Sequence, residues 1–208
     1  MPKLYYRYGT MGASKSANLI MTVNNYKSIG RKVGVLKPST DTRTTDTVSS
    51  RTGMSTKIDI LLDSADDVSF DPEWDALLVD ECQFLQPFQI DQLRALTRKM
   101  PVICYGLRTD YTSHAFPGSL RLLEIADSIE EIKMLCTCCD RKAVFNAMYS
   151  SNSDGTFSVI TTGDSSPVIA GEELFKALCW ECYTKYSDPS TSRAPGFRAT
   201  STDHLTKF

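Results

Sequence analysis

The sequence contains no long apolar run, very few histidines and almost no net charge. Its longest apolar stretches have about four residues, such as 76–79, whereas a helix that crosses a bilayer needs ~20. The first seven residues, Met1 to Arg7, also lack the apolar core of a signal peptide. We therefore expect a cytoplasmic protein that does not associate with membranes.

The charge balance and the two histidines narrow the chemistry further. Lys and Arg number 23 against 25 Asp and Glu, so the net charge is −2 and there is no positive excess for binding a polyanion. Neither His114 nor His204 lies in a recognisable motif. An enzyme with this composition is therefore expected to use a carboxylate as its general base.

Short apolar runs alternate with helical patterns in the first half of the chain, which is typical of a doubly wound α/β sheet. Strands are expected at 4–8, 32–36, 76–79 and 102–105, and helices at 16–26, 86–98 and 120–126. Pro38 is expected to end the second strand, and the polar run 39–56 predicts a long loop without packed structure. The run 76–79 is apolar throughout, as in a parallel strand that is covered on both faces.

The composition changes after about residue 135, where cysteines cluster and polar residues become frequent. We therefore divide the chain into three parts: a nucleotide-binding core, 1–135, a zinc-binding module, 136–186, and a disordered tail, 187–208. The tail holds Pro, Ser, Thr and Arg without any periodicity, which is the composition of a segment that buries little apolar surface.

A phosphate-binding loop is indicated directly after the first strand. Residues 9–16 fit the pattern G-x-x-x-x-G-K-[ST], in which backbone N–H groups and a helix N-terminus surround phosphates, except that Ser14 replaces the second glycine. Lys15 would reach the β- and γ-phosphates, and the Ser16 hydroxyl would bind Mg²⁺. On this motif alone, a Gly/Ser turn with an exposed lysine at a helix start explains the residues equally well.

A second motif in the correct order favours the phosphate loop. The strand at 76–79 is followed by Asp80 and Glu81, and in phosphate-loop enzymes an acidic residue at this strand end holds the Mg²⁺ shell. A charged pair that only closes a buried strand is the competing interpretation, but the two motifs together favour nucleotide binding. The residues assigned to ATP and phosphate binding are Gly9, Thr10, Met11, Gly12, Ala13, Ser14, Lys15, Ser16, Asp80, Glu81, Cys82 and Gln83.

The cysteines are expected to be free thiols or metal ligands, because seven of them in a chain without an export signal do not indicate disulfides. Cys136 with Cys139 and Cys179 with Cys182 form two C-x-x-C pairs, a spacing that lets four thiolates reach one Zn²⁺. The first pair has an alternative, since Cys138 in a C-x-C arrangement could take the place of Cys139. We expect one structural zinc ion per chain.

The charge of the cysteine-rich module indicates what its zinc ion does. The module 136–186 has four basic and six acidic residues, a net charge of −2, which opposes binding to a nucleic-acid backbone. The zinc is therefore expected to be structural, and no nucleic-acid partner is expected. Cys82 and Cys104 border or lie in apolar strands and are expected to belong to the core.

Further short motifs follow one another along the chain. They are Lys37-Pro38 with 41–43, Ser50-Arg51-Thr52-Gly53, 79–85, 105–111, 116–119 and 168–171 ahead of Cys179. In this order, over about 180 residues, they resemble the zinc-containing thymidine kinases of bacteria, phages and animal cytosol. The resemblance implies an α/β fold with a RecA-like P-loop core, a mainly parallel sheet and a small zinc domain that carries a lasso loop, here about 147–178.

The resemblance also implies an activity and a set of site residues. The expected reaction transfers the γ-phosphoryl group of ATP, with Mg²⁺, to the 5′-hydroxyl of thymidine or deoxyuridine, in a homotetramer. Glu81 would be the catalytic base, and Ser16 and Asp80 would hold Mg²⁺; neighbours at a strand end point opposite ways, so Asp80 would face the metal and Glu81 the acceptor. The substrate pocket would be lined by Met11, Phe84, Leu107, Tyr111 and Phe175, for each of which core packing is the alternative.

The chain departs from the family's pattern at a few positions, and two other functions remain as alternatives. Ser14 places a side chain where the backbone approaches phosphate, while Asn146 and Met148 stand where Thr and Arg are usual. If Ser14 lowers or abolishes turnover, the chain would be a catalytically weak or dead nucleotide-binding relative. A RecA-like ATPase acting on nucleic acid is the other alternative, because the segment 80–83 also resembles a helicase box.

Overall fold

The computed structural model describes residues 1–42, 45–151, 157–161, 163 and 175–188. Most of the expected lasso loop, the 168–171 motif, Arg43 and all but the first two residues of the expected tail lie outside these residues. Among the described residues, no helix combines the length and the apolar character that crossing a membrane requires.

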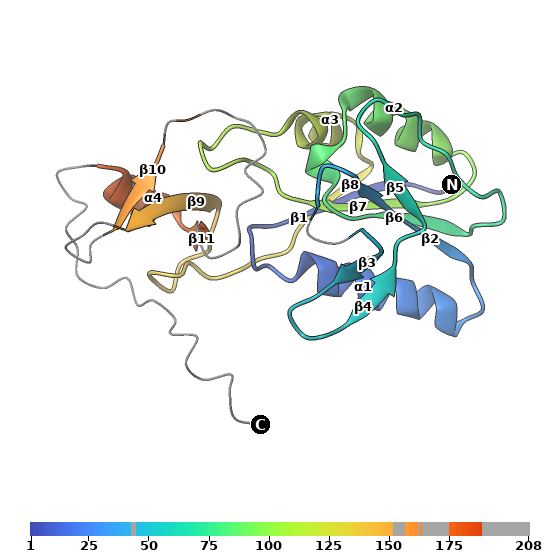
Figure 1. Ribbon diagram of the computed structural model, residues 1–208, viewed down its shortest axis with the longest axis horizontal. Helices are drawn as coiled ribbons and strands as arrows, with labels where there is room; N and C mark the ends of the chain where they lie inside the picture. Colours follow the sequence, from blue (N-terminus) through green and yellow to red (C-terminus); the bar gives the residue numbers. More distant parts are fainter. Residues whose placement is uncertain (43–44, 152–156, 162, 164–174, 189–208) are drawn as a thin grey trace.

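A six-stranded sheet forms the larger part of the protein (Figure 1). Its strand order is β5-β2-β6-β7-β1-β8, and every neighbouring pair is parallel. The strands are β1 (Leu4–Tyr8), β2 (Val33–Pro38), β5 (Ile60–Leu62), β6 (Ala76–Val79), β7 (Val102–Gly106) and β8 (Ser128–Glu131). The predicted α/β core with a mainly parallel sheet is confirmed.

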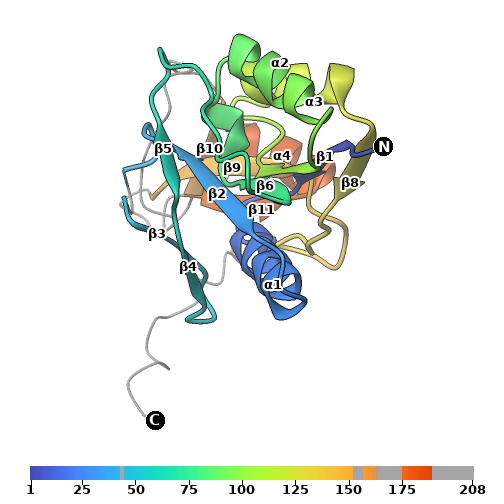
Figure 2. The same cartoon turned by 90° about the vertical axis from the view of Figure 1, so that its right-hand side faces the viewer.

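Helices cover both faces of this sheet (Figure 2). Helix α1 (Lys15–Ser28) lies on one face, and α2 (Pro87–Leu96) and α3 (Pro117–Ile125) lie on the other. Both faces of strand β6 are buried. Leu77 packs in the hydrophobic core formed with α2 and α3, and Leu78 packs in the core formed with α1. Burial on both faces explains why the strand is apolar at every position.

Two details of the first half differ from the sequence-based expectation. The polar run 39–56 contains an antiparallel hairpin of β3 (Thr47–Ser49) and β4 (Ser55–Lys57), because Val48 is buried against the α1 layer. Pro38 is the last residue of β2 instead of ending the strand before it. It is tolerated there because the pairing of β2 with β6 already ends at Leu36, so no neighbour on that side requires its missing N–H.

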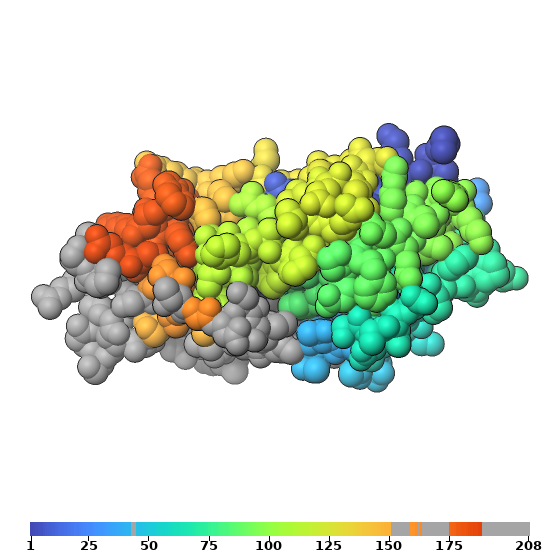
Figure 3. Space-filling view, turned by 90° about the horizontal axis from the view of Figure 1, so that it is seen from above, coloured from blue at the N-terminus to red at the C-terminus, as the bar shows by residue number. Residues whose placement is uncertain are grey.

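A smaller unit occupies one end of the elongated body (Figures 1 and 3). Its antiparallel sheet has the order β10-β9-β11 and is followed by a helix; its elements are β9 (Phe145–Ser151), β10 (Phe157–Ile160), β11 (Phe175–Leu178) and α4 (Trp180–Ser187). A separate hydrophobic core of Ala147, Leu178 and Tyr183 forms here beside buried cysteines. Helix α4 also takes in Ser187, the residue at which we expected the tail to begin.

Candidate active site and cysteine cluster

The phosphate loop connects β1 to α1 and is held by bonds from its own residues and from β7. The Gly9 N–H donates to the Gly106 carbonyl at 3.2 Å, and the Ala13 N–H donates to the Thr10 carbonyl at 3.1 Å. The Lys15 ammonium turns back and donates to the same Thr10 carbonyl at 2.9 Å. The loop therefore presents a cation beside a helix N-terminus, an arrangement that suits a phosphate group.

Ser14 adopts a left-handed backbone conformation, with φ 58° and ψ 30°. Its carbonyl begins the helix by accepting from the Asn18 N–H at 3.0 Å, but its side chain makes no capping bond. A residue with a Cβ is strained in this region by roughly 1–2 kcal/mol, whereas glycine is not. The pattern's preference for glycine at this position thus has a backbone cause, in addition to the side chain near the phosphates.

The two residues assigned to Mg²⁺ meet at the end of β6. The Ser16 hydroxyl donates to the Asp80 carboxylate at 3.3 Å, and Asp80 is 4% exposed. The Asp80 N–H donates to the Leu36 carbonyl at 2.9 Å, which fixes the backbone that carries this carboxylate. A hydroxyl and a carboxylate side by side are oxygen ligands of the type that Mg²⁺ takes, so the residues present fit this ion.

Glu81 lies beyond the strand, which corrects the expected reason for its direction. Strand β6 ends at Val79, and Glu81 has φ 50° and precedes a 3₁₀ turn, η1 (Cys82–Phe84). Strand alternation therefore does not orient Glu81. Its carboxylate accepts from the Gln83 amide at 2.6 Å, and Gln83 in turn accepts from the Leu107 N–H at 3.0 Å. Gln83 thus orients the Glu81 carboxylate and is itself held by the residue that follows β7.

Cys82 and Cys104 are fully buried, as expected for core residues. Burial raises the pKa of both thiols, and the nearby Cys104, Glu81 and Asp80 raise the pKa of Cys82 further. A Cβ added to Gly106 would lie 2.6 Å from the Cys82 sulfur, so this thiol packs closely against β7. The Cys82 side chain, assigned to ATP binding by its motif, is therefore part of the core beneath the site.

The five residues expected to line the substrate pocket come from four segments. Tyr111 is buried, and a Cβ added to Gly163 would lie 2.2 Å from its hydroxyl, so Gly163 lies directly against this side chain. Phe84 packs edge-on against Phe116 with ring centroids 5.8 Å apart. Met11, Leu107 and Phe175 are half-buried.

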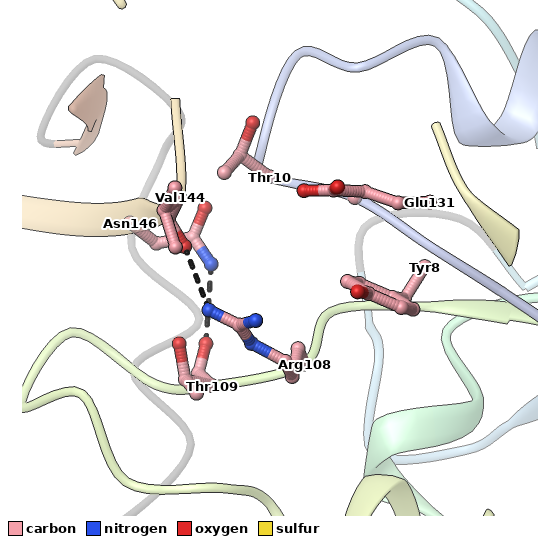
Figure 4. Close-up of a pocket in the computed structure, with 8 residues that line it drawn as sticks. Tyr8, Thr10, Arg108, Thr109, Glu131, Val144 and Asn146 are labelled. Carbon is pink, nitrogen blue, oxygen red and sulfur yellow. Dashed lines mark hydrogen bonds between the residues drawn. The ribbon is translucent and has the colours of Figure 1, made fainter. Parts of the chain in front are cut away.

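A small cleft lies where the phosphate loop, the segment after β7 and the start of β9 meet (Figure 4). It is lined by Tyr8, Gly9, Thr10, Arg108, Thr109, Glu131, Val144 and Asn146. The Arg108 guanidinium lies 5.7 Å from the centre of the Tyr8 ring and donates to the Val144 carbonyl at 3.4 Å.

Sequence reasoning assigned no role to several residues of this region. Arg108 and Thr109 belong to the 105–111 motif, which was their only signal, and Asn146 was noted only as a departure. Arg51, between β3 and β4, is a further residue to which the sequence assigned no role. A Cβ added to Gly12 would lie 3.6 Å from its Nη1 atom, which places the guanidinium beside the phosphate loop.

Four of the cysteines form one cluster. The sulfur atoms of Cys136, Cys139, Cys179 and Cys182 all lie within 4.8 Å of one another, with Cys139 3.6 Å from Cys179 and 3.7 Å from Cys182. Tetrahedral zinc with Zn–S bonds of about 2.3 Å separates its sulfur ligands by about 3.8 Å, so this donor set fits zinc.

The geometry also separates Cys138 from this cluster. Its N–H donates to the Cys136 sulfur at 3.4 Å, and the Cys182 N–H donates to the Cys179 sulfur at 3.5 Å. Such N–H donors stabilise thiolates from outside the ligand set. The Cys138 sulfur does not belong to the group of four sulfur atoms that lie within 4.8 Å of one another. The C-x-x-C choice is therefore favoured over C-x-C.

Comparison with known proteins identifies the family. A protein-family model described as Thymidine kinase matches residues 2–183. The chain belongs to the thymidine kinase family. A thymidine kinase of Chromobacterium violaceum is 37% identical over 187 residues, covering 88% of this chain and 98% of its own. The thymidine kinase of Enterobacteria phage T4 is 36% identical over 197 residues, covering 89% and 98%, and that of Encephalitozoon cuniculi is 34% identical over 189 residues, covering 86% of each.

These matches confirm the resemblance seen in the sequence, including its bacterial and phage character. They extend over the sheet, the cysteine cluster and helix α4 as far as Tyr183. None of them favours a nucleic-acid-dependent ATPase.

Replacing Ser14 by glycine tests the strained position in the phosphate loop of this thymidine kinase family member. We expect Ser14→Gly to raise ATP affinity or turnover, because it removes a side chain where the backbone approaches the phosphates. It should also stabilise the fold, because it relieves roughly 1–2 kcal/mol of backbone strain. Steady-state kinetics with saturating Mg²⁺ measures the change.

Ser113 provides a matched control, because it is also left-handed, with φ 69°, but lies outside the phosphate loop. Ser113→Gly is expected to stabilise the fold against heat without changing the KM for ATP. A neutral or harmful Ser14→Gly would mean that this loop has adapted to serine.

Proposed function

We propose that this chain is an ATP-dependent thymidine kinase, which transfers the γ-phosphoryl group of ATP to the 5′-hydroxyl of thymidine or deoxyuridine. Its main support, in a chain of this family, is that the phosphate loop and the acidic pair meet at the carboxyl edge of one parallel sheet, where the Ser16 hydroxyl bonds to Asp80. Such an edge brings a polyphosphate and an acceptor hydroxyl together.

The phosphate-binding residues act mainly by neutralising and orienting charge. Backbone N–H groups of the loop 9–16 would surround the phosphates, and Lys15 would exchange the Thr10 carbonyl for phosphate oxygens. Ser16 and Asp80 would hold Mg²⁺, which supplies charge neutralisation on the phosphate oxygens. Because phosphoryl transfer requires little covalent participation by the protein, this positioning accounts for most of the catalysis.

Glu81 is the proposed catalytic base, which accepts the proton of the 5′-hydroxyl. The Gln83 amide donates to one carboxylate oxygen at 2.6 Å, which orients the carboxylate. A carboxylate in this role agrees with a chain that has only two histidines.

The nucleoside base is proposed to lie among the aromatic and apolar residues near the end of β7. They are Met11, Phe84, Leu107, Tyr111 and Phe175. The close approach of Gly163 to the Tyr111 hydroxyl supports this position, because Gly163 belongs to the proposed lasso and lies against a residue of the proposed pocket.

A homotetramer in the cytoplasm, the division into a core at 1–135 and a zinc domain at 136–186, and one zinc ion per chain complete the proposal. The homotetramer and its location rest on the family resemblance. The domain division rests on the separate hydrophobic core of the small unit. Sedimentation velocity of the purified protein tests the assembly.

The activity is tested by measuring ADP formation by the purified protein with each nucleoside in turn. Thymidine and deoxyuridine should support turnover, and single-stranded DNA should not. ADP formation that depends on DNA instead of a nucleoside would identify a RecA-like ATPase. ATP binding without any turnover would identify a catalytically dead relative.

Glu81→Gln tests the base directly. The substitution keeps the size and hydrogen bonding of the side chain but removes the proton acceptor, which typically contributes ~10²–10⁴-fold. We expect turnover to fall by about this factor while ATP binding, measured by calorimetry, stays near that of the parent. Asp80→Asn should lower turnover and should also weaken the Mg²⁺-dependent binding of ATP.

Glu124→Gln serves as the control for Glu81→Gln, because Glu124 pairs with Arg121 on helix α3, away from the phosphate loop. It should keep the parent rate. If Glu81→Gln also turned over thymidine at nearly the parent rate, Glu81 would not be the base.

The cysteine cluster is tested by metal analysis of protein purified without chelators. We expect about one zinc per chain. Cys139→Ser should lose the metal, because a hydroxyl is a poor zinc ligand, whereas Cys138→Ser should retain it because Cys138 lies outside the cluster. Loss of zinc from Cys138→Ser, or parent protein without zinc, would contradict this assignment.

A further inference from the structure

One side chain of the small antiparallel sheet bonds directly to the phosphate loop. Asn146 lies in β9 and is 4% exposed. Its Oδ1 atom accepts from the Met11 N–H at 2.7 Å. Its Nδ2 atom donates to the Thr109 carbonyl at 3.1 Å, the bond drawn in Figure 4. A single amide therefore joins the phosphate loop, the segment after β7 and the small sheet.

The two partners determine which way this amide points. One is an N–H group and the other is a carbonyl, so only one orientation of an asparagine satisfies both. Buried hydrogen bonds of this kind lie in a low-dielectric environment, where leaving a partner unpaired is costly. The bonds therefore hold the Met11 backbone in one place.

The strand that carries Asn146 is itself well anchored. Asn146 pairs with Ala177 of β11, and the neighbouring Val144 N–H donates to the Leu178 carbonyl at 2.8 Å. Leu178 directly precedes Cys179 of the cysteine cluster. The position of Asn146 is thus determined by the packing of the small unit and not by the phosphate loop.

A second hydrogen bond links the small unit to the core at a different point. The Tyr183 hydroxyl of α4 donates to the Tyr111 carbonyl at 3.0 Å. This bond reaches only the segment after β7, which is proposed to contact the nucleoside. The Asn146 amide reaches the same segment through Thr109, but it also reaches the phosphate loop through Met11. Of these two contacts, only the one made by Asn146 therefore acts on the phosphate loop.

We propose that Asn146 is a positioning residue that holds the phosphate loop in its ATP-binding shape through the Met11 N–H. Asn146 acts through the backbone of the loop and does not contact the reacting atoms. The inference rests on the proposed kinase function, and it gives the small unit a role in ATP binding.

Asn146→Leu keeps the approximate size of the side chain but removes its hydrogen bonds to the Met11 N–H and the Thr109 carbonyl. We expect the KM for ATP to rise about three- to tenfold, which is the effect of one or two lost hydrogen bonds. The KM for thymidine should rise as well, because Met11 also belongs to the proposed nucleoside pocket. Hydrogen exchange should show faster exchange at the Met11 amide. Asn146→Ala, which leaves room for a water molecule, should show a smaller change in the same direction.

Tyr183→Phe is the matched control, because it removes one hydrogen bond between the same two parts of the protein. It should leave the KM for ATP and the exchange of the Met11 amide unchanged. If Asn146→Leu and Tyr183→Phe changed the KM for ATP equally, the proposal would be overturned and Asn146 would be a purely structural contact. Thermal unfolding identifies a variant that fails to fold, in which case Asn146→Ala decides.

The failure of the proposed function has a different signature. A parent protein that forms no ADP with thymidine would contradict the kinase proposal, but direct calorimetric binding of Mg²⁺-ATP would still test Asn146. Weaker binding by a folded Asn146→Leu or Asn146→Ala protein would support the inference, and unchanged binding would overturn it.

Discussion

The parallel pairing of β6, β7 and β1 is the constraint on which the rest of the site depends. Neighbouring parallel strands end at the same edge of the sheet, so the loops after all three strands meet there. The Gly9 N–H can then reach the Gly106 carbonyl, and Ser16 at the start of α1 can reach Asp80. A cation, a hydroxyl and two carboxylates are thereby brought together from two segments that are far apart in the sequence.

Buried amides organise the charged groups at this edge. Gln83, which is 2% exposed, connects Glu81 to the Leu107 N–H, and Asn146 connects Met11 to Thr109. An amide can donate and accept at the same time and carries no charge. It therefore fixes two loops without the desolvation cost of a buried ion and without altering the electrostatics of the phosphate site.

The small unit has to be stable in spite of its size. Its core contains few large apolar side chains, chiefly Leu178, Tyr183 and Phe145, and small domains bury too little surface to fold firmly without a further link. The proposed zinc ion, held by four thiolates, would provide such a link. A rigid small unit is in turn what allows Asn146 and Tyr183 to hold loops of the larger sheet in place.

Local pattern determined much of this protein. Residues 9–16 and the acidic pair after 76–79 are contiguous motifs, and the apolar runs predict the parallel sheet, so each could be read from neighbouring residues. The hairpin around Val48 was not predicted, because one apolar residue in a polar run is a weak signal for a strand. Three features appear only in the tertiary structure: the left-handed backbone of Ser14 and Glu81, the clustering of the Cys139 sulfur with those of Cys136, Cys179 and Cys182, and the contact of Asn146 with Met11. These features depend on how distant segments pack together, and no local sequence pattern encodes that packing.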